Sequence, residues 1–92
     1  IKPVSMQRLA SECLDELAPE ISRRGIRVDL GELPDARGSA VLLRQVLANL
    51  LGNAVKYTRR QPQAQVQVGC EPVQGEQVYF VRDNGAGFDM QY

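Results

Sequence analysis

The sequence predicts an α+β fold, a two-layer α/β sandwich with helices on one face of a mixed, mostly antiparallel sheet. Two observations lead to this prediction. Two segments with apolar residues at helical spacing enclose a short alternating segment, and two further alternating segments follow, separated by a turn-rich stretch. The order helix, strand, helix, hairpin forms two layers around one core. A chain of 92 residues is long enough for one small domain.

The first predicted helix covers about residues 5–23. Ser5 is suited to cap its start, and Gly25 is expected to end it. A strand over 26–30 follows, because apolar and charged residues alternate there. The apolar residues of the helix recur at intervals of three and four, and they are Met6, Leu9, Ala10, Cys13, Leu14, Leu17 and Ile21.

The second half of the chain predicts a longer helix and a hairpin. Pro34 and Gly38 mark an irregular connection, after which Ser39 caps a helix at about 40–58. Pro62 closes that region. Alternation over 66–70 and a second run over 78–81, separated by the turn-rich EPVQGE segment, predict two antiparallel strands.

The charge balance and hydropathy exclude several kinds of partner. Eleven basic and eleven acidic side chains cancel, so we expect no nucleic-acid partner and no direct membrane contact. No apolar run reaches the roughly 20 residues that span a bilayer, and no signal-peptide pattern opens the chain. A cytoplasmic location is therefore expected.

Histidine and cysteine usage narrows the chemistry. The chain contains no histidine, which excludes histidine acid–base catalysis, histidine metal ligands and phosphohistidine formation within these residues. Cys13 and Cys70 lie in apolar periodic segments and lack metal-ligand spacing. Buried reduced thiols are therefore favoured over a disulfide.

A polar stripe runs along the second predicted helix. Gln45, Asn49, Asn53 and Lys56 fall within about 80° of one another, beside an arc of leucines. An asparagine carbonyl is a hard oxygen donor suited to Mg²⁺, and Lys56 is placed to neutralise phosphates. The alternative is an ordinary solvated helix face. Tyr57 either flanks a ligand or covers the end of the core.

The segment DNGAGF follows the last predicted strand. Asp83 ends that strand, and its carboxylate is suited to accept a hydrogen bond from an exocyclic amine such as that of adenine. The glycines after it permit positive φ and leave room for a flat ring. The alternative is a simple Asx turn. If the hairpin packs beside the second helix, Asn53 and Asp83 face one cleft.

These two segments together resemble a known family. LRQVLANLLGNAVKYT is similar to the N box, and DNGAGF to the first glycine box, of the catalytic ATP-binding domain of bacterial sensor histidine kinases. That domain belongs to the Bergerat-fold superfamily shared with gyrase, and IKPVSM resembles its opening strand. The resemblance implies ATP and Mg²⁺ as cofactors.

The resemblance also implies a role for each site residue. Asn53 would be the Mg²⁺ ligand, with Asn49 in the same box, and both would be catalytic. The nucleotide contacts would come from Lys56 at the phosphates, Tyr57 along the nucleotide, Asp83 at the adenine amine, and Gly85 and Gly87 shaping the pocket.

Asn49 bears on the type of reaction. Hydrolysing relatives of the superfamily carry a water-activating glutamate at the corresponding position, and an amide cannot act as that base. The resemblance therefore implies phosphoryl transfer to a histidine outside this chain. The implied partners are the histidine-bearing dimerisation domain of the same kinase and a response regulator receiver domain.

Two departures from the family pattern are visible. Ser39 stands where an aspartate is common, and the chain ends at Tyr92, before the phenylalanine-containing box, the lid and the second glycine box. Residues 1–92 are thus expected to form a single partial domain, the N-terminal two thirds of the kinase domain. Alone, the chain is expected to be inactive and to self-associate through an unpaired strand edge or an exchanged element, most simply as a two-fold dimer. The alternatives are a degenerate nucleotide-binding or dimerisation module without kinase activity, and a purely structural interaction domain.

Overall fold

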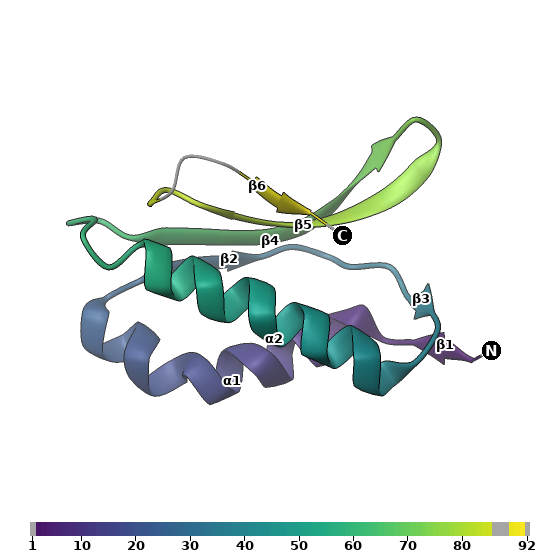
Figure 1. The fold of residues 1–92 in the computed structure, drawn as a ribbon, viewed down its shortest axis with the longest axis horizontal. Helices are drawn as coiled ribbons and strands as arrows, with labels where there is room; N and C mark the ends of the chain where they lie inside the picture. Colours follow the sequence, from purple (N-terminus) through teal and green to yellow (C-terminus); the bar gives the residue numbers. More distant parts are fainter. Residues whose placement is uncertain (1, 86–88, 92) are drawn as a thin grey trace.

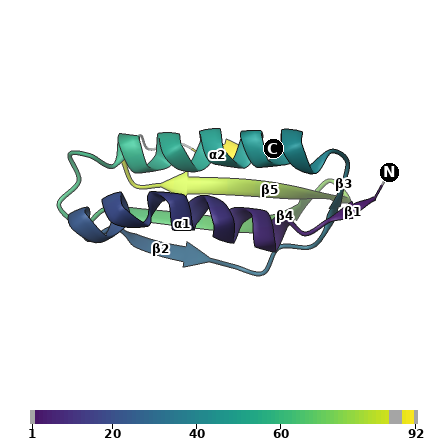
Figure 2. The same cartoon turned by 90° about the horizontal axis from the view of Figure 1, so that it is seen from below.

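The computed structural model describes residues 2–85 and 89–91, the last three as backbone only. Two helices, α1 and α2, lie side by side on one face of a four-stranded sheet (Figure 1 and Figure 2). This arrangement confirms the predicted fold class. In chain order the elements are β1 (Pro3–Val4), α1 (Met6–Arg24), β2 (Arg27–Leu30), β3 (Ala36–Arg37), α2 (Ala40–Tyr57), β4 (Gln65–Val73), β5 (Glu76–Asp83) and β6 (Asp89–Gln91).

The main sheet has the strand order β2-β4-β5-β6. β2 pairs with β4 in parallel, and the other two pairs are antiparallel, so the sheet is mixed and mostly antiparallel as predicted. The predicted hairpin is β4–β5, closed between Val73 and Glu76. Gln74 and Gly75 have φ values of 52° and 80°, the left-handed conformation that a two-residue hairpin turn requires.

Two short strands were not predicted. β3 lies in the connection that was expected to be irregular, and it pairs with β1 in a separate two-stranded sheet. β6 pairs with β5 at the edge of the main sheet. Strands of two or three residues are too short to show a period of two, so alternation cannot reveal them.

Serine caps begin both helices, as the sequence predicted. The Ser5 hydroxyl accepts from the Arg8 N–H at 3.2 Å, and the Ser39 hydroxyl accepts from the Leu42 N–H at 3.3 Å. Gly25 ends α1 with φ of 64°. Neither helix is long and apolar enough to cross a membrane, among the residues that the structure describes.

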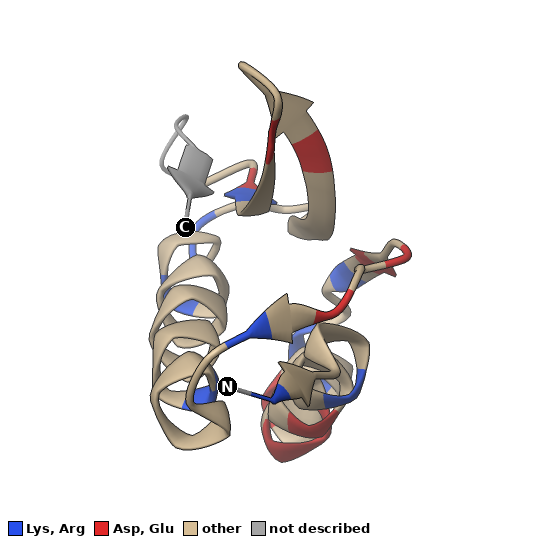
Figure 3. Cartoon of the chain, turned by 90° about the vertical axis from the view of Figure 1, so that its right-hand side faces the viewer, with Lys and Arg blue, Asp and Glu red and all other residues tan. Residues whose placement is uncertain are grey.

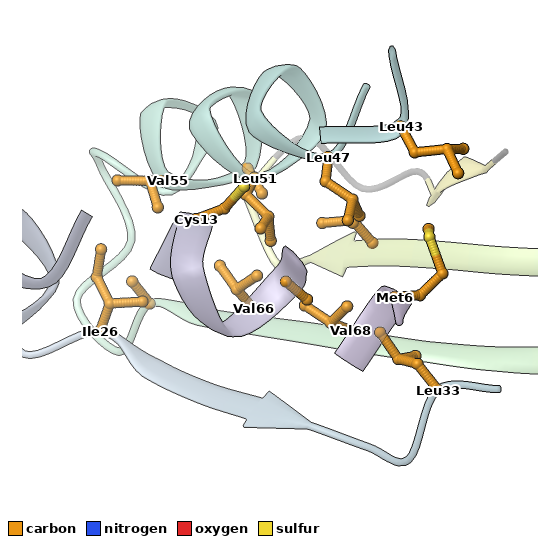
Figure 4. Close-up of a cluster of buried hydrophobic side chains, with 14 of the residues drawn as sticks. Met6, Cys13, Ile26, Leu33, Leu43, Leu47, Leu51, Val55, Val66 and Val68 are labelled. Carbon is orange, nitrogen blue, oxygen red and sulfur yellow. The ribbon is translucent and has the colours of Figure 1, made fainter. Parts of the chain in front are cut away.

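The core lies between the helices and the inner face of the sheet (Figure 4). Ala10 from α1 and Leu51 and Ala54 from α2 are fully buried. Cys13 and Cys70 are both free thiols, and Cys13 is buried as predicted, whereas Cys70 is only half-buried. The labelled side chains of Figure 4 are Met6, Cys13, Ile26, Leu33, Leu43, Leu47, Leu51, Val55, Val66 and Val68.

Ion pairs join the two helices at their solvent-facing side. The Arg44 guanidinium of α2 contacts Glu12 at 2.7 Å and Glu16 at 2.8 Å, both on α1. All three side chains are partly exposed, so these pairs chiefly fix how the helices lie against each other. α2 also packs against β5.

Candidate functional site

The polar stripe of α2 is exposed along its whole length. Gln45, Asn49, Asn53 and Lys56 are all exposed, while Leu43, Leu47, Leu50 and Leu51 of the same helix are buried or half-buried. α2 carries no acidic residue, and Figure 3 shows the acidic segments of the helical layer on α1. An anion approaching this side of α2 therefore meets amides and a cation and no carboxylate from the helix itself.

The donor set of the stripe is compatible with Mg²⁺. Within the described residues, no group of three or more histidine, cysteine, aspartate or glutamate side chains is placed to hold a metal. Mg²⁺ is commonly held by few protein oxygens and takes its other ligands from phosphates and water. The carbonyl oxygen of Asn53, with Asn49 one turn earlier, fits this mode.

Asp83 is the last residue of β5, where it pairs in register with Val66. Its Oδ1 accepts a hydrogen bond from the Gly85 N–H at 2.8 Å, and its Oδ2 is buried. The Asx turn considered as an alternative is therefore formed. It does not exclude a second role, because a carboxylate has about four acceptor positions and the turn uses one of them.

Asn84 anchors the same turn to the start of β4. Its Nδ2 donates to the Gln63 carbonyl at 2.8 Å, and its Oδ1 accepts from the Gln65 N–H at 3.0 Å. Sequence reasoning assigned Asn84 no role of its own. The available signal was the tendency of asparagine side chains to bond to backbone groups in turns.

Gly85 packs directly on the end of α2. A Cβ atom at this position would collide with the Tyr57 carbonyl and lie 2.9 Å from Thr58 Cα. The hairpin end therefore lies beside the second helix, as the one-cleft hypothesis requires. A glycine is needed at this position because the backbone at the end of α2 leaves no room for a Cβ atom. The sequence alone did not reveal this reason. Gly87, the other predicted pocket glycine, lies outside the described residues.

Tyr57 and Lys56 occupy the last turn of α2, next to this contact. Lys56 is exposed, and Tyr57 is 41% exposed. The structure thus brings Asp83, Gly85 and the end of α2 together, with Asn49 and Asn53 further along the same helix.

Two residues that hold this last turn were missed by sequence reasoning. Thr58 is fully buried, and its hydroxyl donates to the Val55 carbonyl at 2.9 Å. Arg24, at the end of α1, donates to the same carbonyl at 2.6 Å and to Thr58 Oγ1 at 3.3 Å. An arginine ending one helix and a threonine ending the next were the available signals, but their proximity depends on how the helices pack.

The remaining reactive side chains do not favour nucleophilic chemistry. Burial raises the pKa of both thiols, Cys13 and Cys70, which keeps them protonated and weakly nucleophilic at neutral pH. Burial likewise raises the pKa of Tyr79, whose hydroxyl donates to the Pro34 carbonyl at 2.6 Å. The candidate site is left with amide oxygens, a lysine and a carboxylate, which suit binding of a charged ligand.

Comparison with known proteins gives a family match. Residues 38–92 match the sequence profile of the family described as histidine kinase-, DNA gyrase B-, and HSP90-like ATPase. The methanogenesis regulatory histidine kinase FilI of Methanothrix harundinacea is 38% identical over 86 residues, 92% of this chain and 10% of that protein. The sensor protein kinase PmrB of Pseudomonas aeruginosa is 33% identical over 90 residues, 97% of this chain and 18% of its own length.

Solved structures agree in fold. The catalytic domain of histidine kinase ThkA superposes with a TM-score of 0.77 at 18% identity, over 95% of this chain and 60% of that domain. At this identity the likeness concerns the fold alone. The chain spans less than a fifth of the length of FilI or PmrB.

Proposed function

Because the chain belongs to the family of histidine kinase-, DNA gyrase B- and HSP90-like ATPases, we propose that it is the ATP- and Mg²⁺-binding part of a sensor histidine kinase. The observation that best supports this function is the packing of the turn after Asp83 against the last turn of α2. That contact joins a purine-recognising carboxylate to the helix that carries Asn53 and Lys56.

In this proposal each end of the site binds one part of the nucleotide. Asp83 accepts a hydrogen bond from the exocyclic amine of adenine, and Tyr57 lies along the nucleotide. Gly85 and Gly87 leave the backbone close to the ring. The position of Asp83 at the end of β5, two residues before the glycine that packs on the end of α2, supports this assignment.

The α2 end of the site binds the phosphates and the metal. Lys56 neutralises phosphate charge, and Asn53, with Asn49, holds Mg²⁺. When bound, Mg²⁺ neutralises the charge that develops on the transferred phosphoryl group. Asn49 is an amide and cannot remove a proton from water, which favours transfer to a protein histidine over hydrolysis.

We further propose that residues 1–92 form the N-terminal two thirds of a kinase ATP-binding domain in the cytoplasm. The 60% coverage of the ThkA catalytic domain supports this division. The phosphorylated histidine belongs to a dimerisation domain and the phosphoryl group passes on to a receiver domain, both outside this chain. Because it has no histidine, the isolated chain is expected not to autophosphorylate.

The isolated chain is also expected to self-associate. β2 and β6 are the outermost strands of the described sheet, and exposed strand edges pair readily with other chains. Light scattering over a concentration series tests this expectation. A monomer at high concentration would contradict it.

The decisive experiment compares Asp83→Asn and Asn53→Ala in the complete kinase. Asp83→Asn should chiefly weaken ATP binding, measured by calorimetry, and Asn53→Ala should chiefly reduce Mg²⁺-dependent autophosphorylation. Gln67→Ala, an exposed amide on β4, is the matched control and should change neither. Wild-type binding and turnover in both site variants would contradict the proposed function. ATP binding without phosphorylation in the wild type would favour the degenerate module.

A further inference from the structure

We propose that Arg24 is a positioning residue for the nucleotide site, acting through the last turn of α2. The proposal rests on the nucleotide-binding function proposed above. Arg24 lies at the end of α1, and its hydrogen bonds to the last turn of α2 go to Val55 and Thr58, which are not proposed ligand groups. Its effect would come from where it holds Lys56, Tyr57 and the turn that follows Asp83.

The Arg24 side chain forms a cross-helix cap. It is only 13% exposed, and its Nη1 donates to the Val55 carbonyl at 2.6 Å while Nη2 donates to Thr58 Oγ1 at 3.3 Å. Carbonyls in the last turn of a helix lack partners within the helix and carry the negative end of its dipole. A guanidinium there makes charge-assisted hydrogen bonds, which are the strong ones. Glu20 Oε2, at 3.7 Å from Nη1, keeps the guanidinium oriented.

The capped turn is the one that bears the proposed site. Lys56 and Tyr57 lie between Val55 and Thr58, the two residues that Arg24 contacts. On the same turn, the backbone of Tyr57 and Thr58 forms the surface on which Gly85 packs too closely for any Cβ. A shift of this turn therefore moves Lys56 and pushes on the segment that presents the Asp83 carboxylate. Close-packed contacts of this kind transmit displacements because they contain no free space.

Arg23 provides the matched comparison. It precedes Arg24 on α1 and pairs with Glu20 at 2.7 Å, but its side chain is 70% exposed and its contacts given by the structure stay within α1. The two arginines thus share an acidic partner and differ in whether they reach α2. If Arg24 positions the site, removing Arg24 should weaken ATP binding and removing Arg23 should not. If the site only needs positive charge at the end of α1, the two losses should be equal.

The test measures ATP affinity by calorimetry in the complete kinase, at a temperature where circular dichroism shows each variant to be fully folded. Arg24→Ala should weaken ATP binding about tenfold, roughly the effect of one net hydrogen bond, because the last turn of α2 loses both bonds from Arg24. Arg24→Lys should restore part of the affinity, because an ammonium can reach one of the two acceptors. Arg23→Ala should bind ATP as the wild type does. Thr58→Val, which removes one acceptor of the cap, should show a smaller loss than Arg24→Ala.

Two results would overturn the proposal. One is wild-type affinity in folded Arg24→Ala, and the other is an equal loss in Arg23→Ala. If Arg24→Ala does not fold, Arg24→Lys and Thr58→Val decide the matter, and wild-type affinity in both refutes the positioning role. Failure of the proposed function would look different, because Asp83→Asn and Asn53→Ala would then also leave nucleotide binding and turnover unchanged.

Discussion

The two helices are close in length and are capped in the same way, but they differ in charge. α1 has 19 residues, α2 has 18, and each begins with a serine that accepts from the N–H three residues on. The charged residues of α2 are only Arg44 and Lys56. The charged residues of α1 are Arg8, Glu12, Asp15, Glu16, Glu20, Arg23 and Arg24.

This difference in charge indicates different roles: α1 supports the fold, and α2 presents side chains to a ligand. The charges of α1 are largely paired with one another or with Arg44, as in Arg8 with Glu12 at 3.2 Å and Arg23 with Glu20 at 2.7 Å. The polar side chains of α2 are mostly amides, which need no counter-charge and have oxygens available for a ligand. One side of α2 should therefore determine stability, and the other should determine ligand binding.

Leu51→Ala should have the largest effect on stability. Leu51 is fully buried on the core side of α2, and removing a buried leucine side chain costs about 2–5 kcal/mol. Urea denaturation followed by circular dichroism measures this change. Leu42→Ala, on the same helix but 62% exposed, should change the free energy of unfolding by less than about 0.5 kcal/mol. Equal losses in the two variants would remove the distinction between the sides of α2.

Gly85→Ala should rank second. The added Cβ meets the backbone of Tyr57 and Thr58, which cannot move aside as a flexible side chain would, and overpacking of this kind costs about 1–3 kcal/mol. ATP affinity should fall as well, because the turn is displaced from α2. Gly52→Ala provides the control: its Cβ meets nothing within 4 Å, so the variant should be more stable by about 0.5–1 kcal/mol. Both changes are read from the denaturation midpoint.

Arg44→Ala should lower stability by about 1 kcal/mol, because two partly exposed ion pairs between the helices are lost. The loss should shrink in high salt, which screens such pairs. Arg8→Ala removes a pair that lies within α1, with the arginine 81% exposed, and should cost less. A loss of several kcal/mol for Arg44→Ala, unaffected by salt, would mean that packing of its side chain dominates.

Asn53→Ala should have the smallest effect on stability, within about 0.5 kcal/mol of the wild type, because its side chain is exposed and alanine is the better helix former. The same variant is expected to lose Mg²⁺-dependent turnover. Loss of turnover without loss of stability in Asn53→Ala would contrast with Leu51→Ala, for which a large loss of stability is expected. A clear loss of stability would show that the asparagine has a structural role.

Local signals made much of the fold predictable. Ser5, Ser39 and Gly25 mark helix ends through their own backbone preferences, and helical spacing placed the core leucines and the exposed amides on different sides of α2. The parallel pairing of β2 with β4 depends on how distant segments meet, and the sequence pattern alone left the sheet mixed or antiparallel.

The site was predictable to a similar extent. Asn49, Asn53 and Lys56 share one stripe because helix geometry fixes their spacing. The contact of Gly85 with Tyr57 and the cap formed by Arg24 depend on tertiary packing, which no local pattern encodes. The shared face of Asn49, Asn53 and Lys56 was therefore predictable, whereas the contacts that hold the last turn of α2 were not, and the binding roles of these residues stay predictions.

The parallel pairing of β2 with β4 also implies an order of assembly during synthesis. β4 and β5 are joined by a two-residue turn, so their pairing closes a short loop and should form early. Arg27 of β2 pairs with Gln65 of β4, and the whole of α2 lies between them in the sequence. β2 is therefore synthesised well before its partner strand. Until β4 arrives, α1 and β2 have no sheet to pack against. We expect the N-terminal half of the chain to remain unfolded during translation and to become protected from proteolysis only once the hairpin has emerged.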